Sequence, residues 1–216
     1  MREIFNGVYS IDDKLATKNL VKGLRVYGEK LIQIDDAEYR SWNPHRSKLS
    51  AAILNGLKTL PIKKDSKALY LGAASGTTAS HMSDIMDEGM IYCVEFSPRM
   101  VRDLLKVCEN RPNMVPVLAD ARRPESYQSI LEKVDLIYQD VAQPNQSEIL
   151  LKNAEFYLKP GGQAIIAIKA RSIDSTKKPE TIIKNELKKI KKSLKVKEVV
   201  DLTPYAKDHC LALCLL

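Results

Sequence analysis

The chain has 216 residues, of which 44% are hydrophobic and 28% are charged, a composition typical of globular proteins and not of disordered ones. This length suits one α/β domain with a small appendage. No apolar run approaches the ~20 residues of a membrane span, and the N-terminal segment lacks the apolar core of a signal peptide. The sequence therefore predicts a cytoplasmic protein with no membrane partner.

The first part of the chain differs in pattern from the rest. Residues 7–11 and 26–34 are rich in β-branched and aromatic side chains and are bounded by turn residues, which predicts strands of a small antiparallel unit. A helix from Ser47 to Leu57 is expected to follow. We therefore predict a small N-terminal β-rich domain at residues 1–46 and a main domain at residues 47–216.

From residue 67 onward, short apolar runs alternate with helical patterns. Runs this apolar suit strands that are covered on both faces, as in a parallel sheet. Ser97 and Pro98 have the residue types of a helix N-cap and first helical position, so they predict a helix start after the second run. The five runs lie at residues 68–71, 90–94, 114–118, 134–138 and 164–168.

Two further apolar runs, at residues 196–200 and 210–214, follow a basic helical segment. Only the segment from Asp201 to Asp208 separates them, which is too short for a helical crossover, so they should pair antiparallel. The predicted fold is therefore α/β, with a Rossmann-like parallel sheet that is closed by an antiparallel terminal strand. A plain dinucleotide-binding domain lacks this ending.

The net charge of +7 is concentrated in one stretch. Eleven Lys and Arg residues and three Asp and Glu residues lie between Lys169 and Lys197, so the rest of the chain is nearly neutral. Such a stretch raises the local concentration of a polyanion such as RNA. It also fits the solvated face of an amphipathic helix, because Ile183 and Leu187 recur among the lysines at helical spacing. Both interpretations can hold for one helix.

The cysteines and histidines show no metal-ligand spacing. The four cysteines form no CxxC pair and lie in runs typical of strands or helices, and the three histidines are scattered. Reduced thiols in the core fit this pattern better than a zinc site or a disulfide. We therefore expect no metal centre.

The segment LGAASGTT follows a predicted strand and opens a helix. Gly72 and Gly76 let the backbone turn tightly and approach a ligand, and the helix start offers free N–H groups. Glu95 ends the next strand, where a carboxylate can accept both hydroxyls of an adenosine ribose. Alone, the glycine pattern fits an unliganded turn equally well. Together with Asp120 and Asp140 at later strand ends, it predicts a nucleoside-containing cofactor at the carboxyl edge of the sheet.

Longer segments make the interpretation more specific. The chain resembles fibrillarin in five successive segments, LGAASGTTASH, VEFSPR, ADAR, QDVAQPNQ and IKARSIDST. The match is densest from Lys67 to Thr176, and the N-terminal unit and lack of a Gly/Arg-rich tail resemble the archaeal form. The resemblance implies a class I methyltransferase domain that uses S-adenosylmethionine to methylate ribose 2′-hydroxyls of rRNA and/or tRNA.

The resemblance also implies partners. The chain would be the catalytic subunit of a box C/D ribonucleoprotein, with a guide RNA, a target RNA, a Nop-domain scaffold protein and a kink-turn-binding protein. It contains no recognisable module that reads RNA sequence, which agrees with target choice by a guide. The alternatives are a stand-alone RNA or protein methyltransferase and a non-catalytic RNP scaffold. The glycine turn also fits an NAD-linked dehydrogenase, but the terminal hairpin disfavours it.

The residues that would contact the cofactor follow from the resemblance. They are, in chain order, Gly72, Ala73, Ala74, Gly76, Thr77, Thr78, Glu95, Phe96, Asp120, Ala121, Asp140 and Gln143. The chain departs from the family pattern just before the glycine turn, where Tyr70 and Leu71 replace the usual acidic residue. No residue is therefore assigned to the methionine amino group.

The catalytic set that the resemblance implies is Lys48, Asp140, Lys169 and His209. A ribose hydroxyl is a poor nucleophile and must lose its proton as it attacks a methyl group. A lysine accepts that proton only as a neutral amine, which partial burial and a nearby second ammonium favour and Asp140 opposes. As alternatives, each lysine could form a surface ion pair, and His209 could be a hydrogen-bonded residue at a strand end.

Overall fold

The computed structural model describes residues 1–216, and its first part is a five-stranded antiparallel sheet. The strands are β1 (Arg2–Phe5), β2 (Val8–Ile11), β3 (Lys14–Lys18), β4 (Leu31–Ile34) and β5 (Ala37–Ser41), in the order β1-β2-β3-β5-β4. The strand predicted at residues 7–11 is confirmed as β2. The strand predicted at 26–34 is wrong in its first half, because Gly28 has φ 82° and Glu29 accepts hydrogen bonds from the N–H groups of Val26 and Tyr27.

The second sheet is mixed and has seven strands. They are β6 (Lys67–Leu71), β7 (Met90–Glu95), β8 (Met114–Leu118), β9 (Val134–Gln139), β10 (Leu158–Lys169), β11 (Lys195–Asp201) and β12 (His209–Leu215), in the order β11-β12-β10-β9-β6-β7-β8. Strands β6 to β10 run parallel, and β12 pairs antiparallel with both β10 and β11. The predicted parallel sheet and its antiparallel ending are confirmed.

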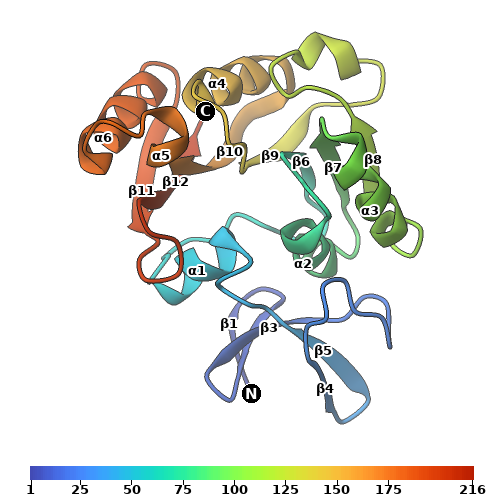
Figure 1. Cartoon of the computed structure of the whole chain (residues 1–216). Coiled ribbons are helices and arrows are strands. Elements are labelled where there is room, and N and C mark those ends of the chain that lie inside the picture. The colour runs from blue at the N-terminus through green and yellow to red at the C-terminus, as the bar shows by residue number, and fades with distance from the viewer.

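Helices cover both faces of the seven-stranded sheet. On one face lie α1 (Lys48–Leu54), α2 (Thr77–Ile85) and α3 (Pro98–Cys108), and on the other lie α4 (Gln146–Tyr157), α6 (Pro179–Ile190) and the 3₁₀ turn η1 (Pro124–Tyr127). The single turn α5 (Ala170–Ile173) follows β10. Figure 1 shows α1 and α2 between the two sheets. None of the helices combines the length and hydropathy needed to cross a membrane.

Helix α1 begins and ends through local backbone chemistry. The hydroxyl of Ser47 accepts from the N–H of Ser50 and caps the helix, which makes Lys48 its first residue. The helix was expected to reach Leu57 but ends at Leu54. Gly56 has φ 92°, a left-handed conformation that stops a helix.

The N-terminal sheet shares its core with the rest of the molecule. Val8, Leu15 and Trp42 belong to the same buried cluster as α1, α2 and one face of the large sheet. Only a cluster of three buried residues belongs to the N-terminal sheet alone. The sheet therefore gains most of its burial from the main body, and the domain boundary between residues 46 and 47 stays a prediction.

A buried ionic cluster joins the N-terminal sheet to α2. The carboxylate of Asp84 lies 2.8 Å from Arg40 and 2.7 Å from Arg111, and the three side chains are at most 2% exposed. Oε1 of Glu29 lies 2.6 Å from Nε of Arg40, and the hydroxyl of Thr17 donates to Asp84. We call these five residues the Asp84 cluster. Its two carboxylates and two guanidinium groups balance in charge and are hydrogen-bonded to protein groups, as buried charges must be.

His81 lies fully buried beside the Asp84 cluster. The Thr17 hydroxyl gives its hydrogen to Asp84, so at 2.8 Å it must accept from Nδ1–H of His81. The Nε2 atom lies 2.8 Å from the hydroxyl of Tyr27, which also lies 3.0 Å from the backbone oxygen of Ser41 and has one hydrogen for these two acceptors. Burial, reinforced by the two arginines of the cluster, holds the pKa of His81 well below its usual value. The ring is therefore a neutral link between the N-terminal sheet and α2.

Candidate active site

Three of the four predicted catalytic residues meet at the carboxyl edge of the large sheet. The Nζ atom of Lys48 lies 3.1 Å from Oδ2 of Asp140, and Nζ of Lys169 lies 2.8 Å from Oδ1. Lys169 also donates to the backbone oxygen of Asp140 at 2.9 Å. The side chains are 23% (Lys48), 16% (Asp140) and 13% (Lys169) exposed. We call these residues the Asp140 triad.

Three separate elements bring the triad together. Asp140 directly follows β9 and Lys169 ends β10. Because β9 and β10 are parallel neighbours, their carboxyl ends lie at the same edge of the sheet. Lys48 arrives from the first turn of α1, which the Ser47 cap places beside that edge.

Two cations share one carboxylate in the Asp140 triad. With both lysines protonated the group carries a net positive charge, and loss of one proton leaves a neutral group with one intact ion pair. A lysine, unlike an arginine, can then act as a base. The triad can therefore accept one proton from a bound substrate.

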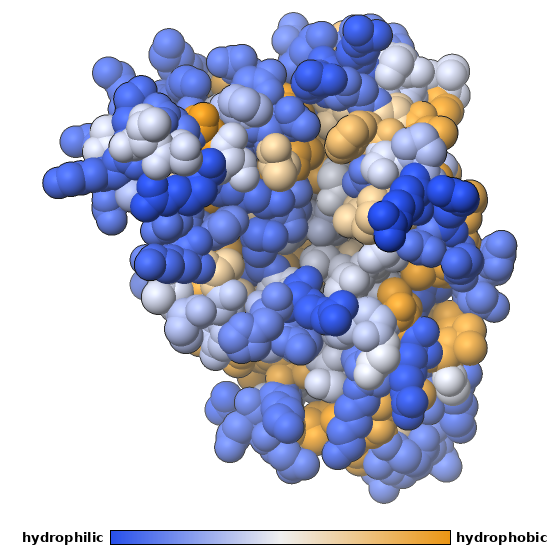
Figure 2. Space-filling model, viewed as in Figure 1, coloured by the Kyte–Doolittle hydropathy of each residue, from blue (hydrophilic) through white to orange (hydrophobic).

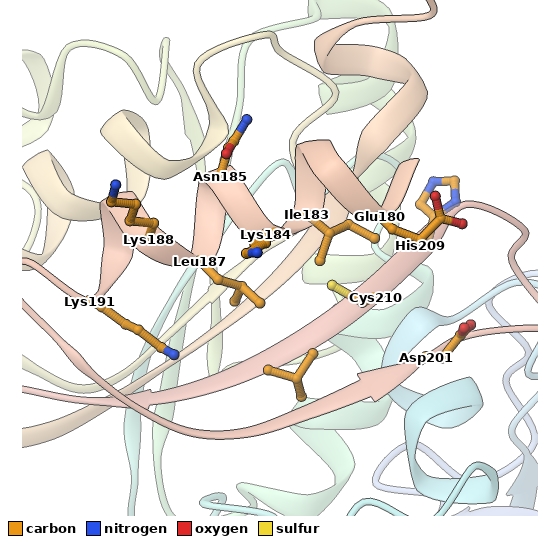
Figure 3. Close-up of a pocket in the computed structure, with 11 residues that line it drawn as sticks. Glu180, Ile183, Lys184, Asn185, Leu187, Lys188, Lys191, Asp201, His209 and Cys210 are labelled. Atoms are coloured by element: carbon orange, nitrogen blue, oxygen red, sulfur yellow. The ribbon is translucent and has the colours of Figure 1, made fainter. Parts of the chain in front are cut away.

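His209 lies opposite Lys169 in the pairing of β10 with β12 but makes no hydrogen bond to the triad. Its Nδ1 donates instead to the backbone oxygen of Lys207 at 2.6 Å. Figure 3 shows the imidazole near Glu180, at one end of a groove between α6 and strands β11 and β12. This geometry fits a hydrogen-bonded residue at a strand end, and the catalytic role of His209 stays a prediction.

The same groove carries part of the basic stretch. It encloses about 700 Å³, and its wall includes Lys184, Lys188 and Lys191. None of these three lysines forms an ion pair, whereas Lys189 pairs with two glutamates. In Figure 3, Lys188 and Lys191 extend from α6 at the end of the groove away from His209. Helix α6 thus packs one side on the sheet and leaves positive charge on its surface, and RNA contact there stays a prediction.

A second cavity opens beside the triad. It encloses about 270 Å³, and in Figure 2 less polar residues line the hollow near the centre of a mostly hydrophilic face. Because Asp140 belongs to both the cavity wall and the triad, a molecule bound here would lie against the reacting groups. The wall contains eight of the predicted cofactor residues, namely Gly72, Ala74, Glu95, Phe96, Asp120, Ala121, Asp140 and Gln143.

The glycine turn lets two backbone segments of the cavity wall pack closely together. Gly72 has φ 79°, and a Cβ atom there would lie 3.0 Å from the backbone oxygen of Asp140. Glu95 braces the turn, since Oε2 accepts from the N–H of Ala74 and Oε1 from the N–H of Ser97, both at 2.9 Å. Each carboxylate oxygen retains a lone pair that can accept from a hydroxyl group.

Four predicted cofactor residues do not line the cavity. Ala73 is buried in the core, Gly76 is the N-cap of α2 and Thr77 is its first residue. The hydroxyl of Thr78 donates to the hydroxyl of Ser47 at 3.0 Å. These residues shape the turn and tie α2 to the start of α1, and a direct contact between any of them and a cofactor stays a prediction.

Two side chains define the far end of the cavity. Arg122 forms a two-pronged ion pair with Asp120, with contacts of 2.6 to 3.0 Å, and this hydrogen bonding holds the pKa of Asp120 below its usual value. Phe96 is 64% exposed, so its ring can cover a flat heterocycle. Arg122 belongs to the ADAR segment, yet no pattern in the sequence assigns it this partner.

No cysteine lines the cofactor cavity or belongs to the Asp140 triad, although Cys210 lines the groove beside α6. All four are free thiols, and no group of three or more His, Cys, Asp or Glu side chains is placed to hold a metal ion. Burial raises the pKa of Cys210 and of Cys214 to about 12. Their thiols are therefore protonated and unreactive at neutral pH.

The sequence as a whole matches known proteins. The fibrillarin family model matches residues 1–216. The chain is 52% identical over 217 residues to a fibrillarin-like rRNA/tRNA 2′-O-methyltransferase of Methanocaldococcus jannaschii. This alignment covers 98% of the chain and 94% of the relative.

Two solved structures are similar over nearly the same length. Fibrillarin of Aeropyrum pernix, solved with natively bound S-adenosylmethionine, has a TM-score of 0.89 and 51% identity, covering 96% of this chain and 92% of that one. A fibrillarin solved in complex with Nop5p has a TM-score of 0.93 and 48% identity, covering 99% of each chain. The chain therefore belongs to the fibrillarin family.

Proposed function

We propose that this chain transfers the methyl group of S-adenosylmethionine to ribose 2′-hydroxyls of rRNA and tRNA, as the catalytic subunit of a box C/D ribonucleoprotein. The observation that carries the proposal is the Asp140 triad, which stands on the wall of the cavity that eight predicted cofactor residues line. Family membership, the activity named for the relative and the cofactor bound by the A. pernix protein support it.

The cavity fits the chemistry of S-adenosylmethionine. Glu95 can accept both ribose hydroxyls, Phe96 can cover the adenine, and the negative charge of Asp140 suits a neighbouring sulfonium. When bound, the cofactor supplies an electrophilic methyl carbon. Tyr70 and Leu71 are buried in the core, so the methionine amino group has no partner among these two residues.

In the proposed reaction the Asp140 triad accepts the proton of the ribose hydroxyl and then releases it. The ribose oxygen forms a bond to the methyl carbon as the carbon–sulfur bond breaks, and the hydroxyl proton passes to the neutral Nζ of Lys169. Lys169 is the more buried lysine, at 13% exposure against 23% for Lys48. Asp140 holds the new ammonium through Oδ1 and its backbone oxygen, and Lys48 holds the other oxygen of the carboxylate. The proton then leaves to water.

The proposed partners are a guide RNA, a target RNA, a Nop-domain scaffold protein and a kink-turn-binding protein. The Nop5p complex of a similar fibrillarin supports the scaffold protein. The net charge of +7 and the unpaired lysines of α6 favour approach to RNA. The chain carries no recognisable module that reads RNA sequence, so the guide RNA would choose the target.

The proposal is tested by methyl transfer from labelled S-adenosylmethionine to RNA. The rate is measured for the chain alone and for the complex reconstituted with the guide RNA and both proteins. We expect little site-specific methylation by the chain alone and restored methylation in the complex. Efficient methylation of one defined nucleotide by the chain alone would contradict guide dependence. Cofactor binding with no methylation in either sample would indicate a non-catalytic scaffold.

A further inference from the structure

The pairing between β9 and β10 stops before β10 ends. The last paired residues are Gln139 and Ile166, so Lys169 has no partner strand on its β9 side. On its other side Lys169 lies opposite His209 of β12, and the neighbouring Ala170 donates to the backbone oxygen of Asp208, which directly precedes β12. The N–H and C=O groups of Lys169 itself point into the gap between β9 and β10, at the position where the Asp140 triad forms.

Gln146 fills this gap. It is the first residue of α4 and is fully buried. Its Oε1 accepts from the N–H of Lys169 at 2.9 Å, and its Nε2 donates to the C=O of Lys169 at 3.3 Å. A side-chain amide carries the same donor and acceptor as a peptide group. Gln146 therefore makes both hydrogen bonds that a neighbouring strand would make to Lys169.

Gln146 is itself held from two directions. Gln139, which directly precedes Asp140, donates through Nε2 to the backbone oxygen of Gln146 at 2.8 Å. On the α6 side the buried carboxylate of Glu186 accepts from the N–H and hydroxyl of Ser147. Gln146 thus ties the end of β9, which leads to Asp140, to the end of β10, which carries Lys169.

We propose that Gln146 is a positioning residue for methyl transfer, whose amide holds the backbone of Lys169 so that Nζ stays against Asp140. Gln146 does not line the cofactor cavity, so it acts only through Lys169. The inference rests on the proposed function, in which Lys169 is the base. A displacement of about 1 Å in a reacting group can lower a rate on the order of 100-fold, so a loosened backbone should slow the reaction.

Gln146→Glu separates positioning from packing, because it keeps the shape of the side chain. A protonated carboxyl can donate to the C=O of Lys169 and accept from its N–H, whereas the carboxylate can only accept. Ionisation therefore breaks half of the contact. The charged groups that face this position are Glu186 from α6 and Asp140, Lys169 and Lys48 at the sheet edge.

The wild-type rate of methyl transfer in the reconstituted complex should rise with pH. The rate of Gln146→Glu should be lower and should rise only at higher pH, because its carboxylate cannot donate to the C=O of Lys169 and also favours the ammonium form of Lys169. Gln146→Ala should lower kcat about 10–100-fold at every pH. The Kd for S-adenosylmethionine should stay within about twofold of wild type in both variants, as calorimetry can measure.

Asn113→Ala is the matched control. Asn113 is also a buried amide with three side-chain hydrogen bonds, but its partners are Ser83 and Met86, away from the triad. It should lower thermal stability and leave kcat of the folded enzyme unchanged. Any of three results would overturn the inference. They are a wild-type kcat in Gln146→Ala, an equal loss of kcat in Asn113→Ala, and a Gln146→Glu rate that equals wild type in size and pH dependence. Failure of the proposed function differs, because the wild-type complex would then transfer no methyl group, and failure of Lys169 as the base would leave wild-type transfer in Lys169→Ala.

Discussion

Two aspartates in this molecule each bind two cations, and the two groups have different surroundings. Asp84 lies 2.8 and 2.7 Å from two arginines, and none of these side chains is more than 2% exposed. Asp140 lies 2.8 and 3.1 Å from two lysines, and these side chains are 13–23% exposed. Each aspartate lies between two cations, but Glu29 supplies a second carboxylate only beside Asp84. The two groups therefore differ in net charge, in the type of cation and in access to solvent.

The comparison separates a structural group from a reactive one. Arginine keeps its proton and offers several fixed donors, so the Asp84 cluster is a permanent contact between the N-terminal sheet and α2. Lysine is a point charge that can lose its proton, and the cavity beside Asp140 gives that proton a route to water. An aspartate between two cations therefore stabilises the fold at Asp84 and can perform chemistry at Asp140.

The largest expected effect tests this separation. Asp84→Asn should lower the free energy of unfolding by about 3–5 kcal/mol, because two buried arginines lose their anion. Asp140→Asn should lower it by about 1 kcal/mol or less, because its lysines reach solvent, while methyl transfer falls strongly. Urea unfolding followed by circular dichroism measures the free energy of unfolding of both variants. Equal losses of stability in the two variants would remove the distinction.

Glu95 extends the comparison to a carboxylate without a cation. It is 6% exposed like a core residue, but it lines the cofactor cavity and accepts only from backbone N–H groups. Glu95→Ala should weaken S-adenosylmethionine binding by about 1–3 kcal/mol through lost hydrogen bonds to the ribose. Calorimetry measures the binding of S-adenosylmethionine to the wild type and to Glu95→Ala, with NAD as the control ligand. Tight NAD binding without S-adenosylmethionine binding would contradict the cofactor assignment.

The smallest expected effect concerns His81, which burial and, to a smaller extent, Arg40 and Arg111 keep neutral. Its pKa is well below the usual value in the folded protein and about 6.5 in the unfolded chain. Below about pH 6.5 the unfolded chain binds a proton that the folded form does not, so stability should fall as the pH is lowered, by at most about 1.4 kcal/mol per pH unit.

His81→Gln should flatten this dependence between pH 7.5 and pH 5. The lowered pKa of Glu29, caused by Arg40 and backbone N–H groups against the opposing effect of burial, affects stability only at more acidic pH, below about 4.5. Thermal unfolding of wild type and variant across this range provides the measurement. An equally steep loss in both proteins would show that His81 is not the group responsible.

Much of the fold could be predicted because its signals are local. Apolar runs mark the strands of the large sheet, and Ser97 and Pro98 cap α3 as expected, with the hydroxyl of Ser97 near the N–H of Met100. The loop at residues 26–30 was not predicted, because its apolar side chains mask the turn at Gly28. The Asp84 cluster was not predicted either, since its members come from segments that only the tertiary fold brings together.

The site could be predicted where chemistry coincides with strand ends or with family segments. Asp140 and Lys169 follow this rule, and Lys48 follows from the resemblance. Gln146 stands in the segment QDVAQPNQ, but its role depends on where the pairing of β9 and β10 stops. His209 lies at a strand end as predicted, but its imidazole bonds to the backbone oxygen of Lys207 and not to the triad. Side-chain direction at a strand end depends on tertiary contacts, which local patterns do not report.

The most direct test of the difference between the two aspartates is Lys169→Arg. Arginine keeps a positive charge beside Asp140 and can still contact phosphate, but it cannot act as a base. The rate of methyl transfer is measured from pH 6 to pH 10 in the reconstituted complex, together with cofactor affinity. We predict a wild-type rate that rises with pH, and a variant rate about 100-fold or more lower at every pH with nearly unchanged cofactor affinity. A variant rate near wild type would contradict the account, because Lys169 would then be only a positive charge.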